Sequence, residues 1–346
     1  MATGANGQVG HELLRALTDI SRDPDPHPYP SPGGRGVQCI SPLPPGEGGA
    51  KRRVRGRPCE IIPAARNGTL ENGTACERID LADLDGLPRA LDRIAPDLIV
   101  NAAAYTAVDR AEDETALALR INGDAVDVLG AWAKQHDARV VHYSTDYVFD
   151  GSATQPYREH DATHPVSAYG RSKLAGEIAL RDSGARHLIF RTAWVYAARG
   201  HNFLRTMLRL GAERDELRVV DDQTGAPTPA RLIAEVTALA IAQWTDDAAP
   251  LRDGVYHLVA AGQTSWCGFA RAIFEHAQRA GLIERAPAVQ AIRTSDYPTK
   301  AVRPAYSVLD TTKLRDAFGV ALPDWQVGLD GVIAELANTR FMNREK

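Results

Sequence analysis

Residues 3–10 read Thr3-Gly4-Ala5-Asn6-Gly7-Gln8-Val9-Gly10, and this short stretch decides the fold. Its glycines recur at every third position, directly before an amphipathic segment over about residues 9–17 that is predicted to be helical. A glycine loop that leads into a helix N-terminus lets backbone N–H groups approach a pyrophosphate, and the helix dipole favours the negative charge. The stretch therefore predicts a dinucleotide-binding turn.

Beyond this turn, short apolar runs alternate with amphipathic segments, as in consecutive βαβ units. Such units place parallel strands side by side with helices on the faces of the sheet. The sequence therefore predicts an α/β fold built on a Rossmann-type, doubly wound parallel sheet. The predicted strands are 97–101, 139–143 and 187–191, and the predicted helices are 112–136 and 167–182.

The pattern becomes irregular after about residue 195, with Pro-rich turns at 225–229 and 297–304 and a helical segment near 265–281. We expect residues 1–194 to form an NAD(P)-binding Rossmann domain and residues 195–346 to form mainly a smaller C-terminal substrate lobe. A cleft between the two lobes is the expected place for a small-molecule site.

Residues 21–58 interrupt the βαβ pattern and hold nine prolines and seven glycines. This composition cannot bury enough apolar surface to offset the entropy of ordering, so it predicts a disordered insertion between the first helix and the second strand. The insertion is either inert or a basic docking segment. After it, Cys59-Glu-Ile-Ile-Pro63 is predicted to be the second strand.

The strand before the glycine loop is short, because only Met1 and Ala2 precede Thr3. A central strand normally supplies about five residues, and burying each apolar one contributes roughly 1.5–3 kcal/mol. We therefore expect a truncated first strand and a marginally stable chain.

The composition excludes several classes of protein. Lys and Arg number 40 against 44 Asp and Glu, so a net charge of -4 offers no field for nucleic acid or an anionic membrane. The chain has no apolar run long enough to span a bilayer and no signal-peptide pattern. Its four cysteines form no Cys-x-x-Cys pair, which argues against a zinc site and fits a reducing compartment. We expect a cytoplasmic protein with a small-molecule partner.

The candidate catalytic residues begin with Tyr169-Gly-Arg-Ser-Lys173 at the start of the predicted helix 167–182. The i, i+4 spacing places both side chains on one helical face. Tyrosine is a weak acid at neutral pH, so the Lys173 ammonium is expected to lower the pKa of Tyr169. Thr145 lies at the end of a predicted strand, where open α/β sheets bind ligands. We predict that Thr145, Tyr169 and Lys173 form one catalytic group.

These motifs together resemble the extended short-chain dehydrogenase/reductases, and within them the dTDP-4-dehydrorhamnose reductases. The resemblance covers roughly residues 1–20 and 59–340. The segments that carry it are Asn101-Ala-Ala-Ala-Tyr-Thr-Ala-Val-Asp109, Ser144-Thr-Asp-Tyr-Val-Phe149, Arg191-Thr-Ala-Trp-Val-Tyr196, Asp221-Asp-Gln-Thr-Gly-Ala-Pro-Thr228 and Pro323-Asp-Trp-Gln-Val-Gly328.

The resemblance implies reduction of dTDP-4-dehydro-β-L-rhamnose to dTDP-L-rhamnose with NADPH or NADH, in the biosynthesis of polysaccharides such as the lipopolysaccharide O-antigen. It implies that Tyr169 donates the proton, that Lys173 also holds the nicotinamide ribose and that Thr145 hydrogen-bonds the reacting oxygen. Asn202 and Arg303 are candidates for the substrate diphosphate. The residues implied to face the sugar are Val108, Thr145, Asp146, Tyr147 and Trp194. Those implied to bind the cofactor are Gly4, Gly7, Gln8, Val9, Gly10, Asp80, Leu81, Ala104, Tyr105, Thr106, Tyr143, Tyr169 and Lys173.

The end of the predicted second strand bears on the choice of cofactor. An acidic residue there usually accepts the adenine ribose hydroxyls of NAD, but this chain has Ala65 followed by Arg66. A guanidinium can instead pair with a 2′-phosphate. We therefore expect Arg66 to bind the cofactor and to favour NADPH.

The resemblance also raises a magnesium site, because some of these reductases form dimers through Mg²⁺ held by clustered carboxylates. Glu12 and Glu335 match two of those positions, but the third is Arg231. Because Mg²⁺ needs oxygen ligands, the cation at that place argues against the site. The sequence leaves a monomer and a homodimer open.

Two other functions stay open from the sequence. A nucleotide-sugar dehydratase or epimerase uses the same scaffold, but dehydratases need an acid and a base after the threonine, where this chain has Asp146-Tyr147. A non-catalytic NADP-binding regulatory subunit, like that of methionine adenosyltransferase, is the second alternative. The complete set of Thr145, Tyr169, Lys173 and Trp194 argues against it.

Overall fold

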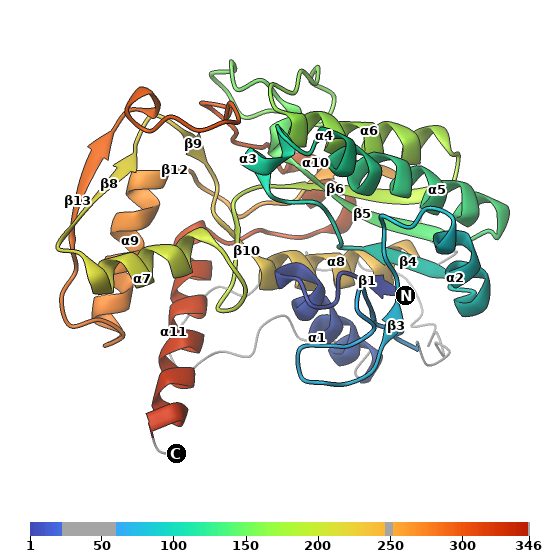
Figure 1. The fold of residues 1–346 in the computed structure, drawn as a ribbon, viewed down its shortest axis with the longest axis horizontal. Coiled ribbons are helices and arrows are strands. Elements are labelled where there is room, and N and C mark those ends of the chain that lie inside the picture. The colour runs from blue at the N-terminus through green and yellow to red at the C-terminus, as the bar shows by residue number, and fades with distance from the viewer. Residues whose placement is uncertain (23–59, 246–251, 345–346) are drawn as a thin grey trace, which may run out of the picture.

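The computed structural model describes residues 1–22, 60–245 and 252–344, and its centre is a five-stranded parallel sheet in the order β1-β4-β5-β6-β11 (Figure 1). The predicted Rossmann-type α/β fold is confirmed, and the three predicted strands correspond to β4, β5 and β6. The strands of this sheet are β1 (Ala2–Thr3), β4 (Leu98–Asn101), β5 (Arg139–Thr145), β6 (Arg186–Thr192) and β11 (Gly254–His257).

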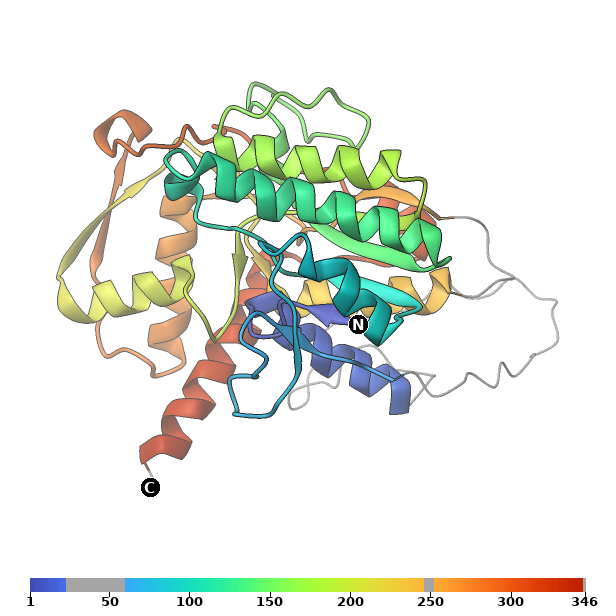
Figure 2. The same ribbon diagram turned by 45° about the vertical axis from the view of Figure 1, so that its right-hand side comes forward.

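Helices cover both faces of the sheet (Figures 1 and 2). Along β5 the side chains alternate: Val141 joins the apolar cluster that includes α8, whereas Val140 joins the cluster with α2 and α5. The helices on the first face are α1 (Gln8–Arg22) and α8 (Ala230–Trp244), and those on the second are α2 (Gly86–Ile94), α5 (Ala125–Gln135) and α6 (Ala168–Asp182).

The first helix is longer than predicted. It extends to Arg22, so the proposed start of the insertion at residue 21 is wrong, because Ser21 and Arg22 continue α1. The rest of the predicted insertion, from residue 23 to residue 58, lies outside the described residues.

The predicted helix 112–136 consists of three pieces. These are α4 (Thr115–Leu119), a π-helical turn η1 (Arg120–Asp124) and α5, and the short α3 (Val108–Ala111) precedes them. The π turn coincides with Asn122, whose side chain bonds both the N–H and the carbonyl of Tyr105. The widened turn therefore carries the side chain that holds the loop after β4 in place.

Cys59 of the predicted second strand lies outside the described residues, and residues 60–63 form no strand. Pro63 forms only an isolated bridge with Ala2, and the paired strands are β2 (Ala64–Ala65) and β3 (Glu77–Arg78). The physical reason is that proline has no N–H to donate and that β1, its neighbour, contains only two residues. Ala2 N–H still donates to the Ile62 carbonyl, which keeps this segment beside β1.

The second half of the chain forms a separate group of elements and also returns to the main sheet. β11 pairs with β6 along its whole length, although it follows residue 194. The division at residue 194 stays a prediction. The other elements of this half are β7 (Val195–Tyr196), α7 (Phe203–Glu213), β8 (Glu216–Val220), β9 (Thr224–Gly225), β10 (Thr228–Pro229), β12 (Thr264–Ser265), α9 (Trp266–Arg279), β13 (Ala288–Ile292), η3 (Thr294–Asp296), α10 (Thr312–Phe318) and α11 (Trp325–Arg344).

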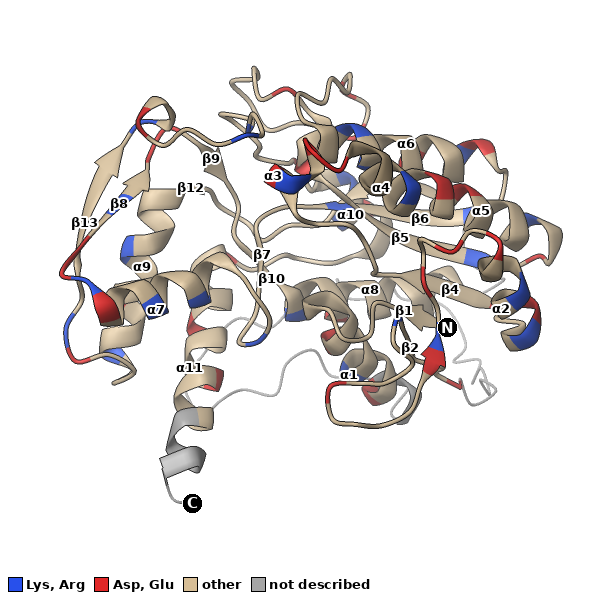
Figure 3. Cartoon of the chain, in the orientation of Figure 1, with Lys and Arg blue, Asp and Glu red and all other residues tan. Residues whose placement is uncertain are grey.

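Charged residues of both signs are interspersed along the outer helices (Figure 3). Within the described ranges, none of the helices is both long enough and apolar enough to cross a bilayer.

Candidate active site

The carboxyl end of β5 brings four of the predicted residues together. Thr145 ends the strand, donates to Asp146 Oδ1 at 2.9 Å and accepts from the Tyr147 N–H at 3.2 Å. The short helix η2 (Asp146–Val148) follows directly. The rings of Tyr147 and Tyr169 meet edge to face with centroids 5.6 Å apart. Thr145, Asp146, Tyr147 and Tyr169 therefore share one site.

A glycine explains how α6 reaches this site. Ser167 caps the helix by accepting from the Gly170 N–H at 3.1 Å. A Cβ at Gly170 would lie 2.2 Å from the Tyr147 carbonyl oxygen, so only glycine permits this approach. The Gly in Tyr169-Gly-Arg-Ser-Lys173 thus sets the distance between the helix and η2.

Lys173 points toward β5 and not toward the Tyr169 hydroxyl. Its amino group donates to the Tyr143 carbonyl at 2.6 Å and lies 3.2 Å from His142 Nε2. The side chain is 2% exposed, and burial lowers the pKa of Lys173 to about 8, while Glu177 opposes this shift.

The expected lowering of the Tyr169 pKa by Lys173 is wrong for this structure. Burial raises the pKa of Tyr169 to about 12, with Thr145 opposing and Asp146 adding to the shift. The reason is that Tyr169 is buried, and the Lys173 amino group binds the Tyr143 carbonyl and not the tyrosine hydroxyl. Tyr169 consequently stays protonated at neutral pH.

Asp146 is the second unusual acid of the site. It is 1% exposed, and burial raises its pKa to about 6. The hydroxyls of Ser307 and Thr145 interact with this carboxyl group and oppose the rise in its pKa. Because each carboxylate oxygen can accept more than one hydrogen bond, the buried Oδ2 atom can also accept from a ligand hydroxyl.

Trp194 adopts the left-handed conformation, with φ 49°. Its ring stacks on Trp266 with centroids 3.5 Å apart, and a Cβ at Gly225 would come within 2.6 Å of the indole. For a non-glycine residue, this backbone conformation costs about 1–2 kcal/mol. The surrounding aromatic and glycine contacts hold the half-buried Trp194 in place.

The glycine loop fits a dinucleotide. Gly4 has φ 65°, and a Cβ there would lie 2.7 Å from the Ala103 N atom; a Cβ at Gly10 would lie 2.1 Å from the Gly4 carbonyl oxygen. Side chains are thus excluded where backbone N–H groups must approach a pyrophosphate. Val9, in the first turn of α1, packs against the core beneath the loop.

Gln8 and Asn202 meet beside the glycine loop. Asn202 Nδ2 donates to Gln8 Oε1 at 2.8 Å, and Asn202 Oδ1 caps α7 by accepting from the Arg205 N–H. This links the second half of the chain to the cofactor loop. Arg303, the other candidate for the diphosphate, forms an ion pair with Asp109 at 2.7 Å. Asp109 directly follows Val108, one of the residues expected to face the sugar.

The remaining predicted cofactor residues follow the ends of neighbouring strands. Arg66 is exposed directly after β2, and Asp80 accepts from the Ala82 N–H at 3.0 Å after β3. Leu81 is buried next to Asp80. Three more form the loop after β4: Ala104, Tyr105 and Thr106.

The side chain of Tyr143 lies on the opposite face of β5 from Lys173. Its hydroxyl donates to Thr237 Oγ1 on α8 at 2.8 Å, so the ring lies in the core. The alternation of side chains along β5 explains this, because Tyr143 faces α8 whereas His142 faces α6. Tyr143 contributes its carbonyl, which binds Lys173.

Asn122 is a site residue that the sequence reasoning missed. Besides holding Tyr105, it donates to Ser172 Oγ at 3.0 Å, which links the loop after β4 to α6. The signal was a polar residue and a glycine, Asn122-Gly123, inside the predicted helix 112–136.

The residues present do not fit magnesium. Arg231 Nε donates to Glu235 at 3.0 Å, and Glu12 and Glu335 lie near enough to raise the pKa of its guanidinium, although burial opposes them. A fixed cation therefore stands among these carboxylates. The described part of the chain contains no cluster of three or more metal-binding side chains.

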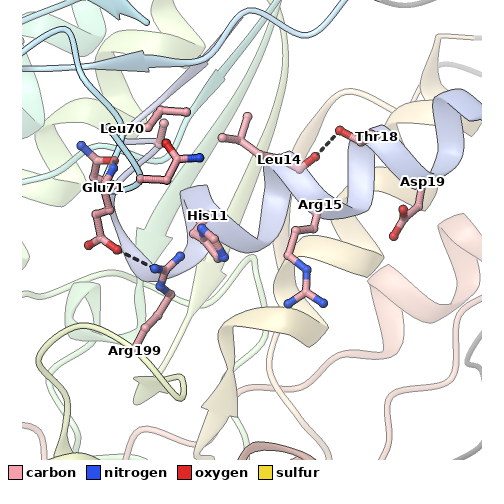
Figure 4. A pocket seen from close by; sticks show the side chains of 11 residues that line it. His11, Leu14, Arg15, Thr18, Asp19, Leu70, Glu71 and Arg199 are labelled. Carbon is pink, nitrogen blue, oxygen red and sulfur yellow. Dashed lines mark hydrogen bonds and ion pairs between the residues drawn. The ribbon is translucent and has the colours of Figure 1, made fainter. Parts of the chain in front are cut away.

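A polar hollow lies beside α1 (Figure 4). Arg199 pairs there with Glu71, and burial lowers the pKa of His11. The hollow includes none of the predicted catalytic residues. It is lined by Ala5, Asn6, His11, Leu14, Arg15, Thr18, Asp19, Leu70, Glu71, Asn72 and Arg199.

The family model described as "RmlD substrate binding domain" matches residues 54–338. A dTDP-4-dehydrorhamnose reductase of Burkholderia thailandensis is 43% identical over 342 residues, which cover 97% of this chain and 98% of the relative. The chain belongs to the dTDP-4-dehydrorhamnose reductase family. The corresponding reductase of Shigella flexneri is 48% identical over 260 residues, covering 75% of this chain and 86% of that protein.

Solved structures agree with the family. A dTDP-4-dehydrorhamnose reductase from Clostridium acetobutylicum has a TM-score of 0.76 at 32% identity, covering 97% of this chain and 98% of that one. The reductase from Bacillus anthracis, solved in complex with NADP, has a TM-score of 0.75 at 29% identity, covering 96% and 98%.

Proposed function

We infer that the chain reduces dTDP-4-dehydro-β-L-rhamnose to dTDP-L-rhamnose with NADPH. One observation carries this inference: Tyr169 lies within hydrogen-bonding reach of Thr145 at the carboxyl end of β5, where the buried Lys173 binds the Tyr143 carbonyl, in a chain of this reductase family. The glycine loop supplies a dinucleotide cradle, and the related Bacillus anthracis structure contains NADP.

When bound, the reduced nicotinamide supplies the hydride that the protein cannot provide. Gly4, Gly7 and Gly10, with the first turn of α1, would hold its diphosphate, and Lys173 would hold its ribose. Tyr169 then protonates the oxygen that gains charge. Because burial raises its pKa to about 12, it carries that proton throughout the neutral range.

Thr145 and Asp146 orient the sugar in this proposal. The Thr145 hydroxyl is positioned by Asp146 and can bond the reacting oxygen, where a preformed donor is most effective. The buried Asp146 Oδ2 can also accept from a sugar hydroxyl. Trp194 supplies a flat apolar wall on which a sugar face packs.

The residue after Asp146 distinguishes reduction from dehydration. Elimination needs a base beside the acid, and Tyr147 stands at that place with its pKa raised by burial. A neutral tyrosine cannot serve as that base. We therefore favour reduction over elimination on this scaffold.

The test is turnover by the purified chain, Tyr169→Phe and the exposed control Tyr297→Phe. With dTDP-4-dehydro-β-L-rhamnose, the parent and the control should consume NADPH and form dTDP-L-rhamnose, while Tyr169→Phe should be nearly inactive. With dTDP-glucose and NAD⁺, the parent should form no 4-keto-6-deoxy sugar. Dehydration of dTDP-glucose, or no reduction by the parent, would exclude the proposal.

A further inference from the structure

A row of buried polar side chains crosses the middle of the sheet. Thr3 on β1, Asn101 on β4 and His142 on β5 are register partners on adjacent strands, so their side chains share one face. Thr3 Oγ1 donates to Asn101 Oδ1 at 2.7 Å, and Asn101 Nδ2 lies 3.1 Å from His142 Nδ1. The row ends where His142 Nε2 lies 3.2 Å from Lys173 Nζ.

Stability alone does not explain this row. Each of Thr3, Asn101, His142 and Lys173 is at most 2% exposed. Burying polar groups gives no gain over an apolar core even when they are hydrogen-bonded, and it costs about 1–3 kcal/mol for each group left unpaired. The adjacent register pair on the same face, Ile99 and Val140, is apolar. An apolar row would therefore pack equally well. This indicates that the polar row serves Lys173, the residue at its end.

The row can support Lys173 in either charge state. Burial and the Lys173 charge hold the pKa of His142 well below its usual range, so the ring is neutral, with one donor and one acceptor nitrogen. With Asn101 Nδ2 toward the ring, Nδ1 accepts and Nε2–H faces an uncharged Lys173. With the Asn101 amide turned over, Nδ1 donates to Oδ1 and Nε2 accepts from the ammonium.

We propose that His142, held by Asn101 and Thr3, is a positioning residue for Lys173. It fixes the lysine amino group against the Tyr143 carbonyl, so that the remaining N–H faces the nicotinamide ribose. Thr3 directly precedes Gly4, so the same row ties the cofactor loop to the catalytic lysine. This proposal rests on the proposed function, since it assigns a role within that site.

The groups that titrate around Lys173 are few. Glu177 and Tyr169 lie on its own helix, His142 lies on β5, and Asp146 on η2 faces Tyr169. Glu177 is locked in a buried bidentate pair with Arg191 of β6. Where His142 Nε2 accepts from the ammonium, the ring stabilises the charged lysine, so an apolar residue in its place should let Lys173 lose its proton at lower pH.

The experiment compares His142→Leu, His142→Gln and Thr3→Val with a matched control, His257→Leu. His257 is equally buried on β11 but contacts the Asp310 carbonyl and not the site. For each protein we would measure NADPH affinity by fluorescence, kcat and KM for the keto-sugar, the alkaline limb of kcat/KM, and Tm.

His142→Leu should weaken NADPH binding about 10- to 100-fold, as for the loss of a hydrogen bond to a charged group, and move the alkaline limb to lower pH. His142→Gln should restore most of the affinity, and Thr3→Val should show a smaller effect in the same direction. His257→Leu should lower only Tm.

NADPH affinity and an alkaline limb unchanged in both His142→Leu and Thr3→Val would overturn the proposal, leaving the row a structural feature. If His142→Leu does not fold, His142→Gln and Thr3→Val decide it by the same readouts. Weakened NADPH binding in a chain that cannot reduce the keto-sugar would instead uphold the role of His142 and refute the proposed function.

Discussion

Lys173→Met should abolish most activity yet leave the ligand-free protein at least as stable at neutral pH. Lys173 is buried, and its pKa falls from the ordinary 10.5 to about 8. That difference corresponds to about 3 kcal/mol of destabilisation while the lysine is charged. The substitution removes this cost but leaves the Tyr143 carbonyl unpaired, which costs about 1–3 kcal/mol. The variant should therefore be up to about 2 kcal/mol more stable at pH 7.

The sign of this effect changes with pH. The folded pKa lies below the unfolded one, so the unfolded chain binds more protons between about pH 8 and 10.5 and the parent gains stability as the pH rises through that window. The destabilisation by the charged Lys173 is fully present below about pH 8 and is lost by about pH 10.5. At the alkaline end Lys173→Met should therefore be about 1–3 kcal/mol less stable than the parent, because only the lost hydrogen bond remains.

Denaturant unfolding of the parent and Lys173→Met at several pH values between about 7 and 10 measures the difference directly. Lys134→Met, at an exposed position of α5, is the control and should show no pH-dependent difference from the parent. A stability difference between parent and Lys173→Met that stays constant across this range would refute the reasoning.

Three further predictions concern the site and the sheet. Tyr169→Phe should lower kcat by roughly 10²–10⁴-fold with NADPH affinity nearly unchanged, because only the transferable proton is removed; full turnover in steady-state assays would reject Tyr169 as the acid. The parent should prefer NADPH over NADH by kcat/KM, and Arg66→Ala should shrink that preference; equal use of both cofactors would contradict it. Adding four or five apolar residues before Thr3 should raise Tm by lengthening β1, whereas equal midpoints would show that the added strand gains no pairing.

Local patterns predicted the parts of the fold that local residues determine. The strands β4, β5 and β6 and the helix α6 follow from apolar periodicity, and the Tyr169/Lys173 pair follows from helical spacing. The second strand could not be placed in this way, because its position depends on the two-residue β1 and on Pro63, which lacks an N–H.

Interactions between distant parts of the chain could not be read from the sequence. The hydrogen bonds that link Thr3, Asn101 and His142 depend on the register of three strands, and no spacing along the chain encodes that register. The direction of Lys173 is similar: helical spacing places it near Tyr169, but the carbonyl of Tyr143 decides where its amino group binds. Helical spacing also does not reveal the burial that raises the pKa of Tyr169.

The most direct test of the central claim is incubation of the purified chain with dTDP-4-dehydro-β-L-rhamnose and NADPH deuterated at the transferable position. We expect loss of NADPH absorbance and dTDP-L-rhamnose that carries one deuterium, at C4 of the sugar. Deuterium at another carbon, a product other than dTDP-L-rhamnose, or unchanged NADPH would contradict it.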